Sequence, residues 1–288
     1  MKLLVFGKSG QVARELAIVS QRNMGVFSFL DRHLADFSFP DPCAKHVLET
    51  DADVVINAAA WTAVDAAESD EAAAHVVNAE TPGALARACA ARDLPFLHIS
   101  TDYVFDGSGD RPWREDDPVA PRNAYGRTKL AGEEAVRAAG GRHLILRTSW
   151  VVSAHGANFV KTMLRLSETR DALSVVDDQV GGPTPARAIA EALVEAAGAM
   201  VAGQGGGTYH FAGQPPVSWA GFATEIFAQS GREVAVTGIP TAEYPTPAER
   251  PLNSRLDCAK LRADFGISPP DWTAGLNEIL QELGQRRT

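Results

Sequence analysis

A tyrosine and a lysine four residues apart, Tyr125 and Lys129, are the most informative pair of side chains in the sequence. On a helix, residues i and i+4 share a face, so the ammonium could lie beside the phenol and favour its anion. A tyrosine that ordinarily titrates near pH ~10 would then exchange protons near neutrality. Thr101 follows the apolar run Phe96–Ile99 and offers a second hydroxyl. These catalytic candidates predict carbonyl reduction: Thr101 and Tyr125 stabilise the developing oxyanion, Tyr125 delivers the proton, and Lys129 lowers the pKa of Tyr125.

A glycine loop at the start of the chain predicts a dinucleotide site. Gly7-Lys-Ser-Gly10-Gln-Val-Ala13 follows the apolar run Leu3–Phe6 and opens a helix, whose N-terminus favours a pyrophosphate. Asp31 stands about 20 residues further on, where a carboxylate can accept hydrogen bonds from a ribose. Arg32 and Lys8 could instead meet the 2′-phosphate of NADP, so both NADPH and NADH remain open. The alternatives are a plain tight turn for the loop and a solvated strand end for Asp31 and Arg32.

The predicted cofactor contacts come from the glycine loop, from the segments after the second and third strands, and from the Tyr–Lys pair. Lys129 would also hydrogen-bond the nicotinamide ribose. The full set is Gly7, Lys8, Ser9, Gly10, Gln11, Val12, Asp31, Arg32, Asp36, Phe37, Ser38, Ala58, Ala59, Ala60, Thr62, Tyr125 and Lys129.

Apolar runs of strand length alternate with helical patterns through the first 150 residues. Such runs are buried on both faces and joined by crossover helices, which predicts an α/β fold with a doubly wound, Rossmann-like parallel sheet. A smaller, interleaved C-terminal α/β region would bind the substrate. We expect a dinucleotide-binding domain over 1–150 plus about 171–201, and a substrate domain over about 151–170 plus 202–288. The expected strands are Leu3–Phe6, Val26–Leu30, Asp53–Ile56, Phe96–Ile99 and His143–Arg147, and the main expected helices are Gln11–Val19, Asp65–Ala91, Ala124–Ala138, Asn158–Leu166, Pro185–Val201 and Trp219–Gln229.

Composition narrows the functional class further. The net charge of −9 and the pI near 5.3 argue against binding of nucleic acid or of an anionic membrane. Cys43, Cys89 and Cys258 are odd in number and widely spaced, as in a reduced, cytoplasmic protein without a zinc site. The apolar run Leu3–Phe6 is too short for a signal peptide or a membrane span.

Taken together, these motifs resemble the extended short-chain dehydrogenase/reductase superfamily and, within it, the dTDP-4-dehydrorhamnose reductase family. The resemblance also rests on four further segments: Asn57-Ala-Ala-Ala-Trp-Thr-Ala-Val-Asp65, Ser100-Thr-Asp-Tyr-Val-Phe105, Asp177-Asp-Gln-Val-Gly-Gly-Pro-Thr184 and Arg250-Pro-Leu-Asn-Ser-Arg255. The resemblance implies reduction of the 4-keto group of dTDP-6-deoxy-L-lyxo-4-hexulose by NADPH or NADH to give dTDP-L-rhamnose. It also implies the substrate contacts: Trp150, Val64 and Tyr103 at the sugar, Asn158 and Arg255 at the nucleotide end, and Asp102. Trp150 could instead be a core aromatic residue, and Arg255 a surface ion-pair partner.

The resemblance also suggests other activities that relatives with this fold carry out. Relatives that dehydrate place Asp-Glu after the threonine, whereas Asp102-Tyr103 stands here, so that chemistry lacks its glutamate. An NAD-retaining epimerase and a non-catalytic regulatory subunit, similar to that of methionine adenosyltransferase, remain as rivals. Some family members bridge a homodimer with magnesium through glutamates; Glu15 matches one, but Arg187 stands where another is expected. We therefore expect no metal and leave the homodimer open.

Overall fold

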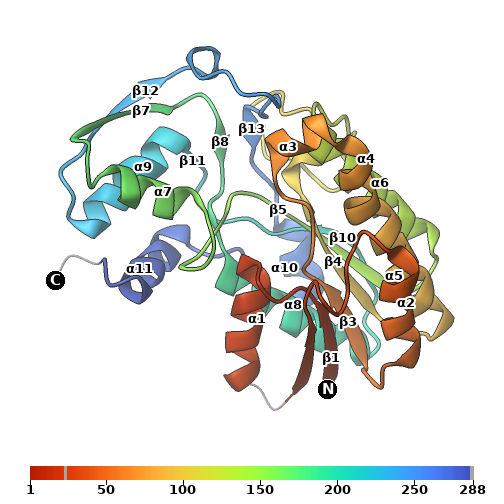
Figure 1. The fold of residues 1–288 in the computed structure, drawn as a ribbon. Coiled ribbons are helices and arrows are strands. Elements are labelled where there is room, and N and C mark those ends of the chain that lie inside the picture. Colours follow the sequence, from red (N-terminus) through yellow and green to blue (C-terminus); the bar gives the residue numbers. More distant parts are fainter. Residues whose placement is uncertain (23–24, 286–288) are drawn as a thin grey trace.

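The computed structural model describes residues 1–22 and 25–285 (Figure 1). Within these residues a six-stranded sheet forms the centre, in the order β10-β5-β4-β3-β1-β2, and its neighbouring strands are parallel. This confirms the predicted Rossmann-like α/β fold. Strand order reverses between β1 and β3, and such a reversal opens a crevice at the carboxyl ends of the strands. The strands are β1 (Lys2–Phe6), β2 (Val26–Leu30), β3 (Val54–Asn57), β4 (Phe96–Thr101), β5 (His143–Thr148) and β10 (Gly207–His210).

Helices cover both faces of this sheet because its strands are apolar on both sides. Leu3 and Val5 pack toward α1 (Gln11–Arg22) and α8 (Ala186–Val201). The alternate residues Leu4 and Phe6 share an apolar cluster with the helices of the other face. Those helices are α2 (Pro40–Glu49), α5 (Thr81–Ala91) and α6 (Ala124–Ala138).

The helical pattern expected over Asp65–Ala91 is not one helix. Asp70, at φ −143° and ψ 58°, breaks it, and its side chain caps the next segment by accepting a hydrogen bond from the Ala73 N–H at 3.2 Å. The observed segments are α3 (Val64–Ser69), α4 (Glu71–His75), a π-helical turn (Val76–Glu80) and α5.

The C-terminal part of the chain builds its own apolar cluster, which contains Phe222, Ile226, Trp272 and Leu276. The cluster lies among α7 (Phe159–Leu166), α9 (Trp219–Ser230), α11 (Trp272–Glu282) and the parallel pair β7 (Ala172–Val176) and β12 (Ala235–Ile239). The remaining elements are β6 (Val151–Val152), β8 (Val180–Gly181), β9 (Thr184–Pro185), β11 (Val217–Ser218), β13 (Asn253–Ser254), α10 (Ala259–Phe265) and the 3₁₀ turns Asp102–Val104 and Thr241–Glu243.

Strand β10 lies in the 202–288 segment that is expected to belong to the substrate region, yet it pairs with β5 in the central sheet. The chain therefore returns to the sheet after α8, and the two-domain division itself stays a prediction. Over residues 1–22 and 25–285, no helix has the length and apolar character needed to cross a membrane.

Candidate active site

A cleft of about 1110 Å³ opens at the carboxyl ends of the central strands. The whole set of predicted cofactor residues lines it, from the glycine loop through the segments after β2 and β3 to Tyr125 and Lys129. The catalytic candidate Thr101 lines it as well. On the side of the C-terminal region, α7 and α9 contribute Phe159 and Trp219. Motifs far apart in the chain thus lie together in this cleft, and the binding and catalytic roles expected of their residues stay predictions.

The glycine loop fits close against the loop that follows β3. Gly7 has φ +106°, and a Cβ at this position would lie 3.2 Å from the Ala58 carbonyl carbon and 3.3 Å from the Ala59 nitrogen. Its N–H donates to the Leu30 carbonyl at 2.9 Å, which joins the loop to β2. Ala13 is fully buried, as the third position of the motif requires. The backbone is thus shaped for a pyrophosphate at the N-terminus of α1.

Gly7→Ala should weaken NADPH binding about tenfold, because an L-residue with positive φ costs on the order of 1–2 kcal/mol and its Cβ presses on Ala58. Quenching of tryptophan fluorescence on coenzyme addition measures the Kd. The control is Gly140→Ala, since Gly140 has φ +72° and open space around its Cβ position. Equal Kd values for Gly7→Ala and the unaltered protein would show that the loop does not hold the coenzyme.

The charged residues of the glycine loop and of the segment after β2 form two ion pairs. Lys8 Nζ lies 3.6 Å from Asp31 Oδ2, and Arg32 Nε lies 3.7 Å from Asp36 Oδ2. Partial desolvation acts to raise the pKa of Asp31, but the backbone N–H groups of Leu34 and His33 and the Lys8 ammonium outweigh it and lower the pKa. Lys8 and Arg32 could each bind the 2′-phosphate of NADPH, and the carboxylates paired with them could each accept a hydrogen bond from the 2′-hydroxyl of NADH. These groups are therefore compatible with both coenzymes.

Thr101 and Tyr125 are brought together by a tight contact between the end of β4 and the start of α6. Asn123 caps α6 by accepting a hydrogen bond from the Gly126 N–H at 2.8 Å. A Cβ on Gly126 would overlap the Tyr103 carbonyl, so α6 needs glycine here. The rings of Tyr103 and Tyr125 meet edge-on, with centroids 5.5 Å apart.

The ionisation of Tyr125 differs from the sequence-based prediction. Burial raises the pKa of Tyr125 to about 12, and although a hydrogen bond with Thr101 opposes this, Lys129 does not lower it. The Lys129 ammonium donates instead to the Ile99 carbonyl at 2.7 Å, while burial lowers the pKa of Lys129 to about 8 against the opposing effect of Glu133. Tyr125 is therefore a phenol throughout the neutral range, as a proton donor must be.

Asp102 is a buried carboxyl group beside the two hydroxyls. Its Oδ1 accepts a hydrogen bond from the Thr101 hydroxyl at 3.1 Å. Burial raises the pKa of Asp102 to about 6, although the hydroxyls of Ser254 and Thr101 oppose the shift. Asp102 is mainly a carboxylate at neutral pH and accepts the single hydroxyl proton of Thr101 when no substrate is bound. That O–H must turn from Asp102 to a carbonyl oxygen before Thr101 can stabilise an oxyanion.

A buried ion pair fixes α6 against the sheet below these residues. Glu133, which is fully buried, accepts hydrogen bonds from Arg147 Nε at 2.8 Å and Nη2 at 2.7 Å, and from the Ser100 hydroxyl at 2.6 Å. Ser100 precedes Thr101 on β4, and Glu133 lies one turn after Lys129 on α6. The bidentate pair therefore sets the relative position of the catalytic candidates. Glu133 and Arg147 lie 14 residues apart on a helix and a strand, so no local spacing in the sequence indicates that they pair.

Five of the six residues predicted to contact the substrate line the cleft, and one does not. Val64, Asp102, Tyr103, Trp150 and Asn158 line the cleft. The Asn158 side chain also makes hydrogen bonds within the protein: it caps α7 and donates to Gln11 Oε1 at 2.9 Å. Arg255 lies away from the cleft lining and donates to Asn253 Oδ1 at 3.0 Å.

Trp219 is a cleft residue that sequence reasoning missed. Its ring stacks on Trp150 at a centroid distance of 3.5 Å and an interplanar angle of 11°. Trp150 itself has φ +48°, which is unusual for a residue other than glycine and is typical of functional sites. The two residues are 69 positions apart on unrelated elements, so no local spacing connects them.

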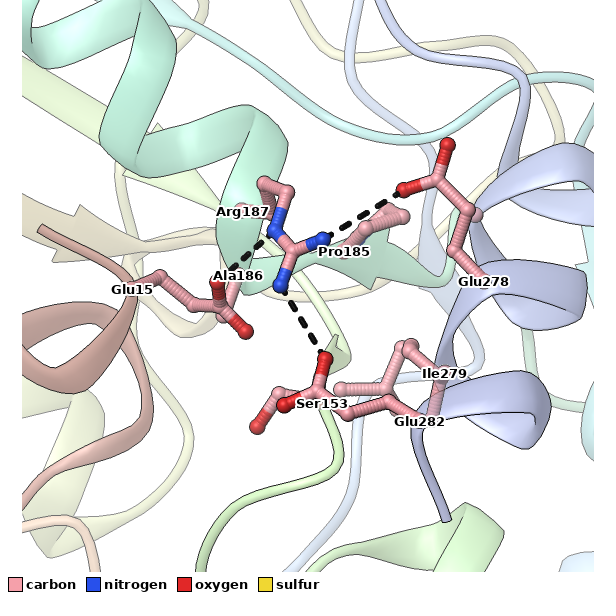
Figure 2. A pocket seen from close by; sticks show the side chains of 10 residues that line it. Glu15, Ser153, Pro185, Ala186, Arg187, Glu278, Ile279 and Glu282 are labelled. Atoms are coloured by element: carbon pink, nitrogen blue, oxygen red, sulfur yellow. Dashed lines mark hydrogen bonds and ion pairs between the residues drawn. The ribbon is translucent and has the colours of Figure 1, made fainter. Parts of the chain in front are cut away.

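A second cluster of charged residues lies between α1, α8 and α11 (Figure 2). Glu15, His155 and Glu282 bring potential ligand atoms within 4.8 Å of one another. The Arg187 guanidinium lies among the carboxylates, 2.9 Å from Glu15, 3.0 Å from Glu282 and 3.9 Å from Glu278. A fixed cation thus already neutralises much of the negative charge that would attract a divalent ion.

We expect activity to be unchanged by dialysis against EDTA and by added magnesium, because Arg187 supplies the positive charge at this cluster. Initial rates before and after chelation test this, with metal content of the protein measured in parallel. A loss of activity that magnesium restores would contradict the expectation.

The chain is similar to known proteins along nearly its whole length. The family model "RmlD substrate binding domain" matches residues 1–285. A dTDP-4-dehydrorhamnose reductase of Burkholderia thailandensis is 46% identical, with 98% of this chain and 99% of that protein covered. The crystal structure of a dTDP-4-dehydrorhamnose reductase from Clostridium acetobutylicum superposes with a TM-score of 0.93 at 38% identity, covering 99% and 100% of the two chains. A Bacillus anthracis dTDP-4-dehydrorhamnose reductase, solved in complex with NADP, gives a TM-score of 0.91 at 32% identity over 98% and 99%.

Proposed function

The chain belongs to the dTDP-4-dehydrorhamnose reductase family, and we propose that it reduces the 4-keto group of dTDP-6-deoxy-L-lyxo-4-hexulose to give dTDP-L-rhamnose. It is an oxidoreductase that uses NADPH or NADH. One observation carries the proposal: Thr101, Tyr125 and Lys129 line the same cleft as the glycine loop. A carbonyl compound in this cleft would meet two hydroxyls beside the coenzyme site.

The proposed reaction divides the chemistry between coenzyme and protein. When bound, NADPH or NADH supplies the hydride to the carbonyl carbon. The hydroxyls of Thr101 and Tyr125 donate to the oxygen as negative charge grows on it, and the phenol proton then completes the alcohol. Lys129 stabilises the tyrosinate that remains, returns a proton to it, and hydrogen-bonds the nicotinamide ribose. Solvent finally reprotonates Lys129.

The proposed substrate contacts fall into two groups, one for the sugar and one for the nucleotide. We assign the sugar to the side lined by Val64, Tyr103 and Trp150, with Trp219 added to that set. Asp102 would accept a hydrogen bond from a sugar hydroxyl. The nucleotide end would lie toward Asn158. Arg255 does not line the cleft, and its assignment to the nucleotide stays a prediction.

Thr101→Val should lower kcat by about 10²-fold while changing KM little, because the lost hydroxyl donates to the oxygen only as charge develops. The matched control is Thr81→Val, since Thr81 is a fully buried threonine whose hydroxyl donates to the Phe37 carbonyl at 2.7 Å. Steady-state kinetics of both variants separate the effects. A Thr101→Val enzyme with normal kcat would exclude Thr101 from the reaction.

The proposed function is tested by coenzyme oxidation with the 4-keto sugar nucleotide, generated in situ from dTDP-glucose by the upstream enzymes. Substrate-dependent oxidation and formation of dTDP-L-rhamnose are expected, and the rates with NADPH and NADH give the preference. Folded protein that binds a coenzyme but oxidises neither would refute the proposal. Retained NAD without net oxidation would then favour the epimerase, and co-purification with a larger enzyme the regulatory subunit.

A further inference from the structure

A row of three buried polar side chains lies beneath the cleft and ends at Lys129. Asn57 at the end of β3, His98 on β4 and Lys129 on α6 are 1%, 0% and 2% exposed. Asn57 Nδ2 lies 3.0 Å from His98 Nδ1, and His98 Nε2 lies 3.4 Å from Lys129 Nζ. The proposed reaction gives His98 no part, although it lies beside the lysine on which that reaction depends.

The backbone decides which nitrogen of His98 carries the proton. The Ala59 N–H donates to Asn57 Oδ1 at 3.0 Å, so the carbonyl end of this amide is already used and its NH₂ end faces His98. Nδ1 of His98 must therefore accept. Burial and the nearby Lys129 lower the pKa of His98 well below 6.5, so the ring is neutral and has one proton, on Nε2. That N–H points at Lys129.

A donor facing Lys129 disfavours its ammonium form. An ammonium has three donors and no lone pair, whereas the neutral amine can accept from His98 Nε2–H and still donate to the Ile99 carbonyl. The other groups on α6 act differently: Glu133 favours the ammonium, and Tyr125 is a neutral phenol. Asn57 from β3 is neutral and reaches Lys129 only through His98.

We infer that His98 is a positioning residue for Lys129, to which it presents an N–H donor and thereby makes the lysine proton easier to release. This inference deepens the proposed function, because it gives the catalytic lysine a readily exchanged proton. After each turnover Tyr125 lacks a proton, and a lysine that releases one near neutrality can restore it. The ring also holds Nζ in place between β4 and α6.

NMR titration of the protein labelled with ¹³C at lysine Cε tests the inference without the reaction. The chain has six lysines, so the spectrum is simple, and Lys129→Arg assigns the resonance of Lys129. Burial already lowers the pKa of Lys129 to about 8, so we expect its midpoint at or below that value. In His98→Gln the amide can turn its oxygen to the ammonium, and the midpoint should rise by about one pH unit.

A second histidine supplies the matched control. His210 on β10 is fully buried, contacts Arg147, and lies outside the cleft lining. His210→Gln should disturb the fold comparably, but because His210 acts on Lys129 through the Arg147–Glu133 pair, it should move the Lys129 midpoint much less than His98→Gln does. An unchanged midpoint in His98→Gln, or an equal rise in both variants, would overturn the inference.

The tautomer of His98 can be read in the unaltered protein, so the test does not depend on a variant that folds. ¹⁵N-histidine spectra should show His98 protonated on Nε2 at every pH at which the protein is folded, and a proton on Nδ1 would overturn the inference. The failure of the proposed function is distinguishable from this. If the midpoint moves as expected but Lys129→Met remains fully active, the pairing stands and the catalytic assignment falls.

Discussion

Tyr125→Phe should lower kcat by about 10³-fold and leave the Kd for NADPH nearly unchanged. The substitution removes only the proton donor, and general acid catalysis contributes about 10²–10⁴-fold. The ring remains to pack against Tyr103, with which Tyr125 makes an edge-on contact. The pKa of Tyr125 is raised to about 12, so the native residue carries its proton throughout the neutral range and the loss should be similar across it.

Tyr209→Phe is the control for that result. Tyr209 is a buried tyrosine on β10 whose hydroxyl donates to Asp264 at 3.0 Å, and its pKa is likewise raised to about 12. It lies outside the cleft lining, so its loss should affect stability and not turnover. Single-turnover rates and coenzyme Kd values for both variants provide the comparison. Near-normal turnover in Tyr125→Phe would eliminate Tyr125 as the donor.

Lys129→Met should also lower kcat by about 10³-fold, and it should weaken coenzyme binding as well. Methionine fills most of the buried volume but cannot return a proton to Tyr125 or donate to a ribose hydroxyl. The change also leaves the Ile99 carbonyl without its donor at 2.7 Å, so some loss of thermal stability is expected. Measuring kcat, coenzyme Kd and Tm separates these effects.

The chain offers an exposed lysine away from the cleft whose ammonium makes similar contacts. Lys260 donates to the Thr208 carbonyl at 2.9 Å, and its Nζ lies 4.5 Å from the centre of the Tyr209 ring. Lys260→Met therefore removes an ammonium that binds a carbonyl beside a tyrosine, and turnover should persist. Comparable losses of turnover in both variants would mean that Lys129 acts through stability alone.

Local patterns predicted the elements of the fold well where they depend on short-range chemistry. The helix Ala124–Ala138 begins at its Asn123 cap and ends where expected. Two features escaped prediction because tertiary contacts set them. Asp70 interrupts a pattern that is helical in composition, and β10 joins the sheet by pairing with β5, 60 or more residues earlier in the chain.

The candidate site likewise has features that local sequence patterns predict and features that only tertiary contacts determine. Motifs tied to a backbone requirement, such as Gly7 and its positive φ, identified the cleft from sequence. The sequence could not reveal that Trp219 stacks on Trp150 or that His98 contacts Lys129, because these contacts join separate elements. The direction of the pKa shift at Tyr125 was also missed, since it depends on burial of the phenol rather than on the spacing of Tyr125 and Lys129.

Hydride transfer to the carbonyl carbon is the central claim, and isotope transfer tests it most directly. The enzyme is incubated with the 4-keto sugar nucleotide and NADPH carrying deuterium in the transferable position, and the product is analysed by mass spectrometry and NMR. Our account predicts dTDP-L-rhamnose with one deuterium, located at carbon 4 of the sugar. Product without coenzyme-derived deuterium, or deuterium at another carbon, would contradict it.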